Sequence, residues 1–142
     1  MTDLVESEAL LADPAALGMQ QHPEGGWFRE TYRSPQSVDT ERGPRSLATS
    51  VLFLLLPSEV SAWHRVASDE LWLWQGGGRV QLTLGGTGAT PEAGDVMTLG
   101  PGDQFLVPAQ VWQTAQPADN RAVIVGCLVS PGFDFADFTL AL

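Results

Sequence analysis

The chain holds only two histidines, and one of them, His64, is followed six positions later by a glutamate, Glu70. Side chains alternate along a β-strand, so Glu70 would share one face of its strand with Trp72 and Trp74. If a short turn joins the two segments as an antiparallel pair, His64 and Glu70 point into one pocket walled by indole rings. An imidazole and a carboxylate at that range can transfer protons or bind a metal ion, and we take both as candidate catalytic residues.

The partner of Glu70 decides what this pair can do. A carboxylate between apolar neighbours needs a buried partner, and the alternatives to His64 are Arg29 and Arg65. Indole walls disfavour the charged form of either group, whereas pairing stabilises the carboxylate and the imidazolium. We expect pairing to dominate, so that His64 titrates at or above its model value of about 6.5.

Further aromatic and polar residues are candidates for contacts with a substrate. Aromatic rings commonly wall small-molecule cavities, and a side-chain amide there acts as a hydrogen-bonding group and only as a weak metal ligand. Along 27–32 the side chains alternate between two faces, and the alternation alone does not tell which face lines the interior. The candidate substrate-binding residues are Trp72, Trp74, Gln113, Arg29 and Tyr32. We expect His22, which precedes Pro23, to cap a loop.

The composition limits the classes of protein and partner. A chain of 142 residues with 44% hydrophobic and 17% charged residues can form a single domain, 1–142, around one core. The acidic N-terminal segment lacks the features of a signal peptide, and no apolar run reaches the length of a membrane span, which predicts a cytoplasmic protein. A net charge of −10, with seven arginines and no lysine, disfavours nucleic acid and membrane surfaces and leaves a small-molecule ligand. Cys127, in an apolar run, is expected to be buried and inert.

From Gly25 onward the pattern predicts an all-β protein. Short apolar or alternating runs are separated by Gly, Pro, Asp and Ser, which is typical of a sandwich, jelly roll or barrel. The expected strands are Trp27–Tyr32, Leu47–Leu56, Ser61–Val66, Glu70–Gln75, Arg79–Leu84, Asp95–Leu99, Gln104–Val107, Val111–Ala115 and Arg121–Ser130. Before them, Ser7–Leu17 favours a short helical segment, and Pro14 can open a further short turn after Asp13.

Two spaced motifs in this chain resemble those of the cupin superfamily. The first reads as a histidine, a glutamate and a glycine at the family spacing, with the second histidine of the motif replaced, and its residues are His64, Val66, Glu70 and Gly77. The second keeps a glycine and a proline and replaces a glycine and the final histidine, and its residues are Gly102, Pro108, Gln110 and Gln113.

The chain is more closely similar to the short RmlC-like cupins of unknown function. The phrases that carry this resemblance are His22–Ser34, Ser61–Arg65, Ser68–Glu70, Val107–Gln113 and Pro131–Phe135. Leu73 stands where these proteins usually have a histidine, but by alternation it faces away from Glu70. The resemblance implies a double-stranded β-helix, the cupin jelly-roll barrel, and commonly a homodimer, and it implies little about the reaction.

Three functions fit these residues. In the first, a metal-independent isomerase or epimerase-like enzyme uses His64 as acid or base on a small polar or sugar-like substrate, with Glu70 orienting the ring. In the second, a cupin oxygenase, decarboxylase or isomerase holds a divalent metal at His64, Glu70 and Gln113. In the third, the protein binds a small ligand without chemistry. Because two motif histidines are missing, we rank the first above the second and expect no tightly bound metal.

Overall fold

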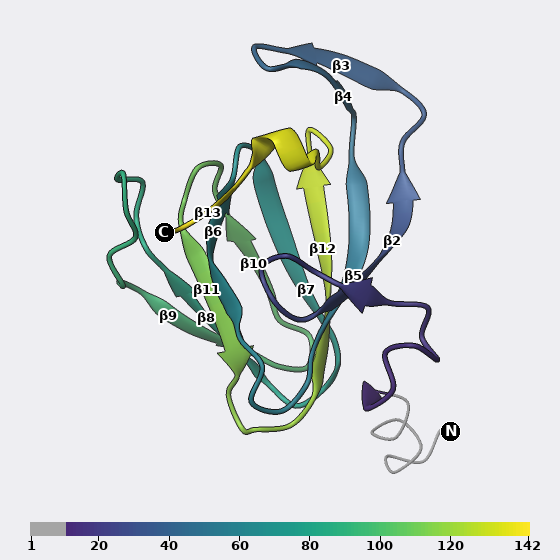
Figure 1. Ribbon diagram of the computed structural model, residues 1–142, viewed down its shortest axis with the longest axis vertical. Coiled ribbons are helices and arrows are strands. Elements are labelled where there is room, and N and C mark those ends of the chain that lie inside the picture. Colours follow the sequence, from purple (N-terminus) through teal and green to yellow (C-terminus); the bar gives the residue numbers. More distant parts are fainter. Residues whose placement is uncertain (1–10) are drawn as a thin grey trace.

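The computed structural model describes residues 11–142, which form two antiparallel β-sheets that face each other (Figure 1). One sheet has the strand order β1-β2-β5-β12-β7-β10 and the other the order β13-β6-β11-β8-β9, while β3 and β4 form a separate hairpin. The strands are β1 (Gln20–Gln21), β2 (Trp27–Arg33), β3 (Ser37–Thr40), β4 (Gly43–Ser46), β5 (Thr49–Leu55), β6 (Ser61–Val66), β7 (Asp69–Gly77), β8 (Val80–Leu84), β9 (Val96–Leu99), β10 (Gln104–Val107), β11 (Gln113–Pro117), β12 (Val123–Ser130) and β13 (Phe138–Leu140), and a short 3₁₀ turn, η1 (Phe135–Asp137), precedes the last. This arrangement confirms the expected all-β jelly-roll barrel.

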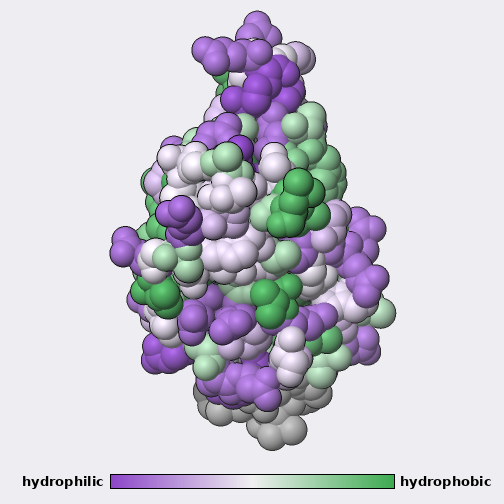
Figure 2. Space-filling model, turned by 60° about the vertical axis from the view of Figure 1, so that its left-hand side comes forward, coloured by the Kyte–Doolittle hydropathy of each residue, from purple (hydrophilic) through white to green (hydrophobic). Residues whose placement is uncertain are grey.

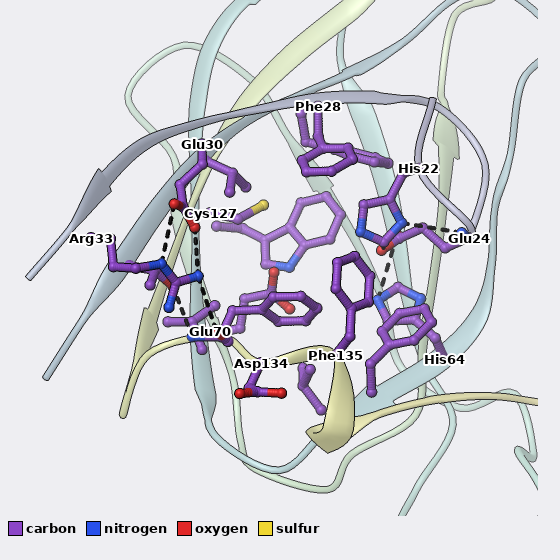
Figure 3. Close-up of a pocket in the computed structure, with 18 residues that line it drawn as sticks. His22, Glu24, Phe28, Glu30, Arg33, His64, Glu70, Cys127, Asp134 and Phe135 are labelled. Atoms are coloured by element: carbon purple, nitrogen blue, oxygen red, sulfur yellow. Dashed lines mark hydrogen bonds and ion pairs between the residues drawn. The ribbon is translucent and has the colours of Figure 1, made fainter. Parts of the chain in front are cut away.

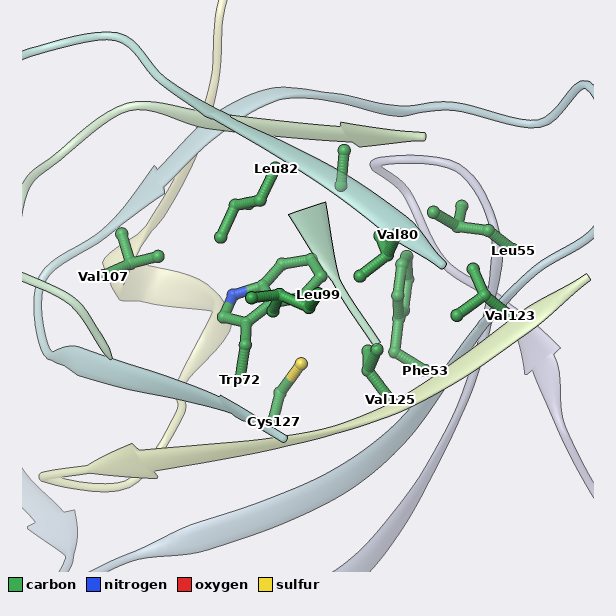
Figure 4. Packing of buried hydrophobic residues seen from close by; sticks show 11 residues of the cluster. Phe53, Leu55, Trp72, Val80, Leu82, Leu99, Val107, Val123, Val125 and Cys127 are labelled. Carbon is green, nitrogen blue, oxygen red and sulfur yellow. The ribbon is translucent and has the colours of Figure 1, made fainter. Parts of the chain in front are cut away.

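The hydrophobic core fills one end of the space between the sheets (Figure 4). Alternate side chains of the facing strands meet there, among them Phe53, Trp72 and Val80. The apolar run of β5 does not alternate with polar residues because both faces of this strand are covered. On its outer face Leu54 packs against Leu11 and Met19 of the N-terminal segment.

All nine expected strands are present, and the structure adds β1, β3, β4 and β13, which the sequence pattern did not predict. The hairpin β3–β4 is rich in polar residues, projects away from the barrel in Figure 1 and forms the hydrophilic top of the surface in Figure 2. Of the helical segment expected at Ser7–Leu17, residues 7–10 lie outside the described residues, and residues 11–17 form turns and not a continuous helix. The turn expected at Pro14 is present, with the amide of Leu17 donating to the Pro14 carbonyl over 3.1 Å. Within residues 11–142 no helix is long and apolar enough to cross a membrane.

One expected pairing is wrong. The strands β6 and β7 are consecutive in the chain, but β6 pairs with β11 and β13 in one sheet, whereas β7 pairs with β12 and β10 in the other. His64 and Glu70 therefore approach each other across the barrel interior and not within a hairpin. Alternation still directs both side chains inward, as expected from the sequence.

Candidate functional site

A cavity of about 370 Å³ opens between the two sheets at the end that the core leaves free (Figure 3). Its wall consists of aromatic and aliphatic side chains with polar groups at two ends. The lining residues are His22, Glu24, Phe28, Glu30, Arg33, Thr49, Val51, Phe53, His64, Val66, Glu70, Trp72, Cys127, Val129, Phe133, Asp134, Phe135 and Phe138. The candidates His64, Glu70 and Trp72 are among them.

His64 is buried on β6, with 3% of its surface exposed. Its Nδ1 lies 2.8 Å from the carbonyl oxygen of Ala62. Because a carbonyl only accepts, Nδ1 carries the proton, and the lone pair of neutral His64 is on Nε2. That Nε2 lies 3.5 Å from Oε2 of Glu24. The structure therefore fixes the ring with its basic nitrogen toward a carboxyl group.

The expectation that His64 titrates at or above 6.5 is wrong. Burial lowers the pKa of His64, and the opposing effect of the Glu70 charge is smaller. The aromatic wall removes water from the ring, as shown by Phe138, whose ring centroid lies 5.4 Å from that of His64. At neutral pH the imidazole is consequently uncharged, the form that can accept a proton.

Glu24, which was not among the candidate residues, is the carboxyl group nearest to His64. It lies in the loop between β1 and β2, accepts a hydrogen bond from the hydroxyl of Ser61, and lies 3.2 Å from Nδ1 of His22. Burial raises the pKa of Glu24 to about 8, against a smaller lowering by the Ser61 hydrogen bond. Glu24 is thus a protonated, neutral acid at pH 7, beside a neutral imidazole.

A tight turn brings Glu24 into the cavity. The amide of Gly25 donates to the carbonyl of His22 over 2.9 Å, and the amide of His22 donates to Gly26. Gly25 has a φ of +104°, and a Cβ there would lie 2.3 Å from the carbonyl oxygen of Val60. Only glycine fits this position, so the turn that carries Glu24 depends on Gly25.

His22 has two roles, of which the sequence predicted one. Its Nδ1 accepts a hydrogen bond from the backbone amide of Glu24 over 3.1 Å, which is the expected loop cap. Its ring also lines the cavity and meets the ring of Phe28 edge-on at 4.8 Å. Burial, followed by repulsion from His64, lowers the pKa of His22 to about 4, so this ring is also neutral.

Glu70 is held by residues other than His64. Its Oε1 accepts a 2.7 Å hydrogen bond from the amide of Gln113, whose own oxygen accepts one from the indole of Trp72 over 3.0 Å. Burial raises the pKa of Glu70, and the charge of His64 and the hydrogen bonds from Gln113 and Cys127 oppose this. Gln113 is fully buried behind the wall and positions Glu70, which differs from its expected role in binding substrate.

At the other end of the cavity, an irregularity in β2 places Glu30 and Arg33 together. Glu30 pairs with Val51 on β5, but Tyr32 pairs with Ser50, so Thr31 is an additional residue in β2. Glu30 and Arg33 would face opposite sides of a regular strand, and this bulge turns both inward. Arg33 donates to both carboxylate oxygens of Glu30, over 3.2 and 2.6 Å, and to the carbonyl of Phe133 over 3.2 Å.

Besides Gln113, three further expected substrate-binding residues do not line the cavity. Arg29 donates to the carbonyl of Leu17 over 2.8 Å on the outside of the sheet. Tyr32 is 53% exposed on the same side, as the bulge requires. Trp74 packs against the core and donates its indole proton to the carbonyl of Gly78 over 2.8 Å. Of the five expected substrate-binding residues, only Trp72 lines the cavity.

The C-terminal segment covers one side of the cavity. Phe133, Phe135 and Phe138 line it, and their rings contact one another at centroid distances of 4.9 to 6.2 Å. In the same segment, Asp137 accepts two hydrogen bonds from Arg45, each over 2.8 Å. These bonds join the C-terminal segment to the β3–β4 hairpin. Hydrogen bonding to Arg45 lowers the pKa of Asp137.

The donors do not fit the metal site that the motif residues suggested. The oxygen of Gln113 accepts from Trp72, and its amide faces Glu70, so Gln113 presents no free donor atom to the cavity. Among the residues described, no group of three or more His, Cys, Asp or Glu side chains is arranged to hold a metal ion. His64, Glu70 and Gln113 therefore do not form a three-ligand site.

Comparison with known proteins identifies the family. A model described as Cupin superfamily (DUF985) matches residues 15–141. The chain belongs to this family. An uncharacterized protein of Saccharomyces cerevisiae, YML079W, is 30% identical over 137 residues, which cover 84% of this chain and 68% of the yeast protein. Protein SO0799 from Shewanella oneidensis is 32% identical with a TM-score of 0.78, over 99% of this chain and 85% of that chain.

A more distant structure has only its fold in common with this cupin. The dTDP Sugar Isomerase from Desulfovibrio desulfuricans G20 has a TM-score of 0.58 and 17% identity, over 81% of this chain and 83% of that one. The family resemblance explains how Glu24 could have been found from the sequence, because Glu24 lies within the family phrase His22–Ser34. Its position next to His64 depends on the turn geometry and required the structure.

Proposed function

We propose that this cupin is a metal-independent, isomerase- or epimerase-like enzyme that moves a proton on a small hydroxylated substrate. The observation that supports the proposal is the pairing of His64 Nε2 with Glu24 at 3.5 Å in a buried cavity. One group is a neutral base and the other a neutral acid at pH 7, because burial lowers one pKa and raises the other. Such a pair is ready to act on a carbon acid without any change in net charge.

The proton transfers balance as follows for an α-hydroxy carbonyl compound. His64 Nε2 removes the proton from the carbon that bears the hydroxyl group, while Glu24 gives its proton to the neighbouring carbonyl oxygen, and a neutral enediol forms. Glu24 then takes the proton of the other hydroxyl group, and the His64 imidazolium returns its proton to the former carbonyl carbon. The substrate is isomerised, and both residues end in their starting states.

The positions of the carboxyl groups favour transfer on one face of the substrate. Glu24 and His64 are adjacent, so both approach the substrate from one side, as an isomerisation through an enediol requires. Inversion at one carbon would need a proton donor on the opposite face. Glu70 is the other carboxyl group of the described wall whose pKa burial raises, and it would be that donor. The fold shared with a sugar isomerase agrees with either reaction.

The experiment is a hydrogen-exchange assay in D₂O. Protein treated with a chelator is incubated with a panel of aldoses, ketoses and small hydroxyketones, and the loss of carbon-bound ¹H is followed by NMR. We expect exchange with at least one compound, and a decrease of about 10²- to 10⁴-fold in His64→Gln and in Glu24→Gln. Glu92→Gln, an exposed carboxyl on the β8–β9 loop, is the matched control and should keep full activity.

Two results would reject the proposal. If a panel compound binds and no carbon-bound proton exchanges, the protein is a binding module. If exchange disappears on chelation and returns with a divalent metal, the enzyme is metal-dependent. In Glu70→Gln, loss of an epimerisation with retention of an isomerisation would assign Glu70 to the second face.

A further inference from the structure

We infer that the ligand of this cavity is an uncharged polyhydroxylated compound of about monosaccharide size, and not a phosphate, nucleotide-diphosphate or carboxylate derivative of one. The inference takes the location of the site from the proposed function, but it concerns binding and not the reaction. It follows from three features of the wall: the state of its single cation, the distribution of its carboxyl groups, and the aromatic surface between its polar ends.

The only arginine that lines the described cavity is already neutralised. Arg33 donates three hydrogen bonds, two to the carboxylate oxygens of Glu30 and one to the carbonyl of Phe133. Anionic groups are bound in proteins by charge-assisted hydrogen bonds from cations that are free to form them. These contacts use Nε and Nη2, so a phosphate could reach only Nη1 and would lie beside the Glu30 carboxylate, which already balances the charge of Arg33.

The remaining titratable groups of the wall add no positive charge. His22 and His64 are neutral because burial lowers both pKa values. Against Arg33 stand four carboxyl groups, those of Glu24, Glu30, Glu70 and Asp134. A ligand anion would therefore meet the carboxylates of Glu30 and Asp134, the uncharged acid of Glu24 and apolar rings, and the net charge of −10 on the chain adds to the repulsion.

The same groups suit hydroxyl groups well. Carboxyl oxygens accept hydrogen bonds from hydroxyls at both ends of the cavity, and Figure 3 places Glu30 and Arg33 at one end and His22, Glu24 and His64 at the other. Between them lie aromatic faces, including that of Phe135, which is 52% exposed at the opening. Apolar rings cover the C–H faces of a ring-shaped polyol while its hydroxyls reach the polar ends.

The size of the cavity agrees with a small ligand. Its volume of about 370 Å³ is near the lower end of the range of roughly 300–1,000 Å³ that is common for small-molecule sites. A nucleotide-linked sugar would extend past the opening, where Glu30 already balances the charge of Arg33 and Asp134 adds a carboxylate close to the diphosphate.

The test compares matched ligands. Binding of neutral aldoses and ketoses, of their 6-phosphates and of the corresponding sugar acids is measured by ligand-observed NMR and calorimetry at pH 7, together with one dTDP-sugar. We expect a neutral member to bind and its charged counterparts to bind at least about tenfold more weakly, a difference of about 1.4 kcal/mol. In Glu30→Gln, which frees Arg33, this difference should shrink, whereas Glu92→Gln should keep it.

Clear results overturn the inference. Tighter binding of a phosphate, an acid or the dTDP-sugar than of its neutral counterpart would do so, and so would failure of every neutral member to bind at millimolar concentration. An unchanged preference in Glu30→Gln would show that the paired arginine does not set selectivity. Repeating the measurements in His64→Gln separates the two proposals, because a neutral sugar that binds wild type and variant alike but is never turned over refutes the reaction and leaves the ligand class standing.

Discussion

Replacing Glu24 with glutamine should make the folded protein more stable at alkaline pH while reducing the proposed activity. Glutamine has nearly the same shape as glutamic acid, can still accept the hydrogen bond from Ser61, and can donate to His64 or His22. It carries no proton that ionises, so the cost of burying a carboxylate disappears. The variant therefore separates the electrostatic role of Glu24 from its packing.

The magnitude follows from the pKa of Glu24, which rises from 4.5 to about 8 on folding. In the unfolded chain the carboxyl ionises near pH 4.5, and in the folded protein it holds its proton until about pH 8, so the free energy of unfolding contributed by this group falls across that interval and is constant above it. The full interval corresponds to about 5 kcal/mol at about 1.4 kcal/mol for each pH unit. Relaxation around the carboxylate reduces this, and we expect about 2–4 kcal/mol.

The assay is urea unfolding of wild type and Glu24→Gln at several values between pH 5 and 8.5. The quantity of interest is the difference in the free energy of unfolding between variant and wild type, because contributions from groups that do not contact Glu24 cancel in it. That difference should increase steadily in favour of the variant and level off near pH 8, at equal m-values. Glu92→Gln makes the same chemical change on the surface and should show no such increase.

A flat difference would refute the reasoning. If Glu24→Gln and wild type differ by a constant amount from pH 5 to 8.5, Glu24 ionises equally easily in the folded and unfolded states. Glu24 would then be a carboxylate at pH 7 and could not give a proton to a substrate, and the reaction proposed above would lose its acid.

Three further outcomes are expected. Gln113→Ala should lower the free energy of unfolding by roughly 2–4 kcal/mol in urea titrations, because it leaves a cavity and two buried polar groups without partners, and a change below about 1 kcal/mol would contradict this. An NMR titration of the His64 ring should give a pKa below 6.5 that falls further in Glu70→Gln, since the Glu70 charge opposes the effect of burial; a value at or above 6.5 in wild type would be contrary evidence. Light scattering should find a homodimer that Leu106→Asp converts to a monomer, because Leu106, 48% exposed, lies beside Leu71 on an outer sheet face that a second copy can cover; a wild-type monomer at micromolar concentration would exclude it.

Local patterns in the sequence predicted the strands where alternation and turn residues agree. The bounds expected for β6 and β10 are those of the structure, since side chains alternate along each run and turn-forming residues lie close to both ends. The β3–β4 hairpin was not predicted because it has no apolar face and packs on no core. It is held instead by ion pairs of Arg42 and Arg45 with Asp137, more than ninety residues away in the chain.

The same reasoning placed the inward side chains correctly and their partners wrongly. Alternation is a property of one strand, so it could direct His64, Glu70 and Trp72 into the cavity. Which side chain a buried group meets depends on the sheet that each strand joins, and β6 and β7 join opposite sheets. The pairing expected between His64 and Glu70 assumed a hairpin, whereas the structure pairs His64 with Glu24 and Glu70 with Gln113.

The residues that alternation missed lie where the backbone leaves the regular strand. Glu24 is in a turn that depends on Gly25, and Arg33 faces inward only because Thr31 is an extra residue in β2. Both irregularities bring ionisable groups into the wall, and that is why the acid of the proposed reaction and the cation of the opening come from them. A regular strand would have placed Arg33 on the outer face with Arg29, leaving Glu30 as an unpaired carboxylate in the cavity. The bulge therefore fixes the charge balance at the opening, and with it the kind of ligand that can enter.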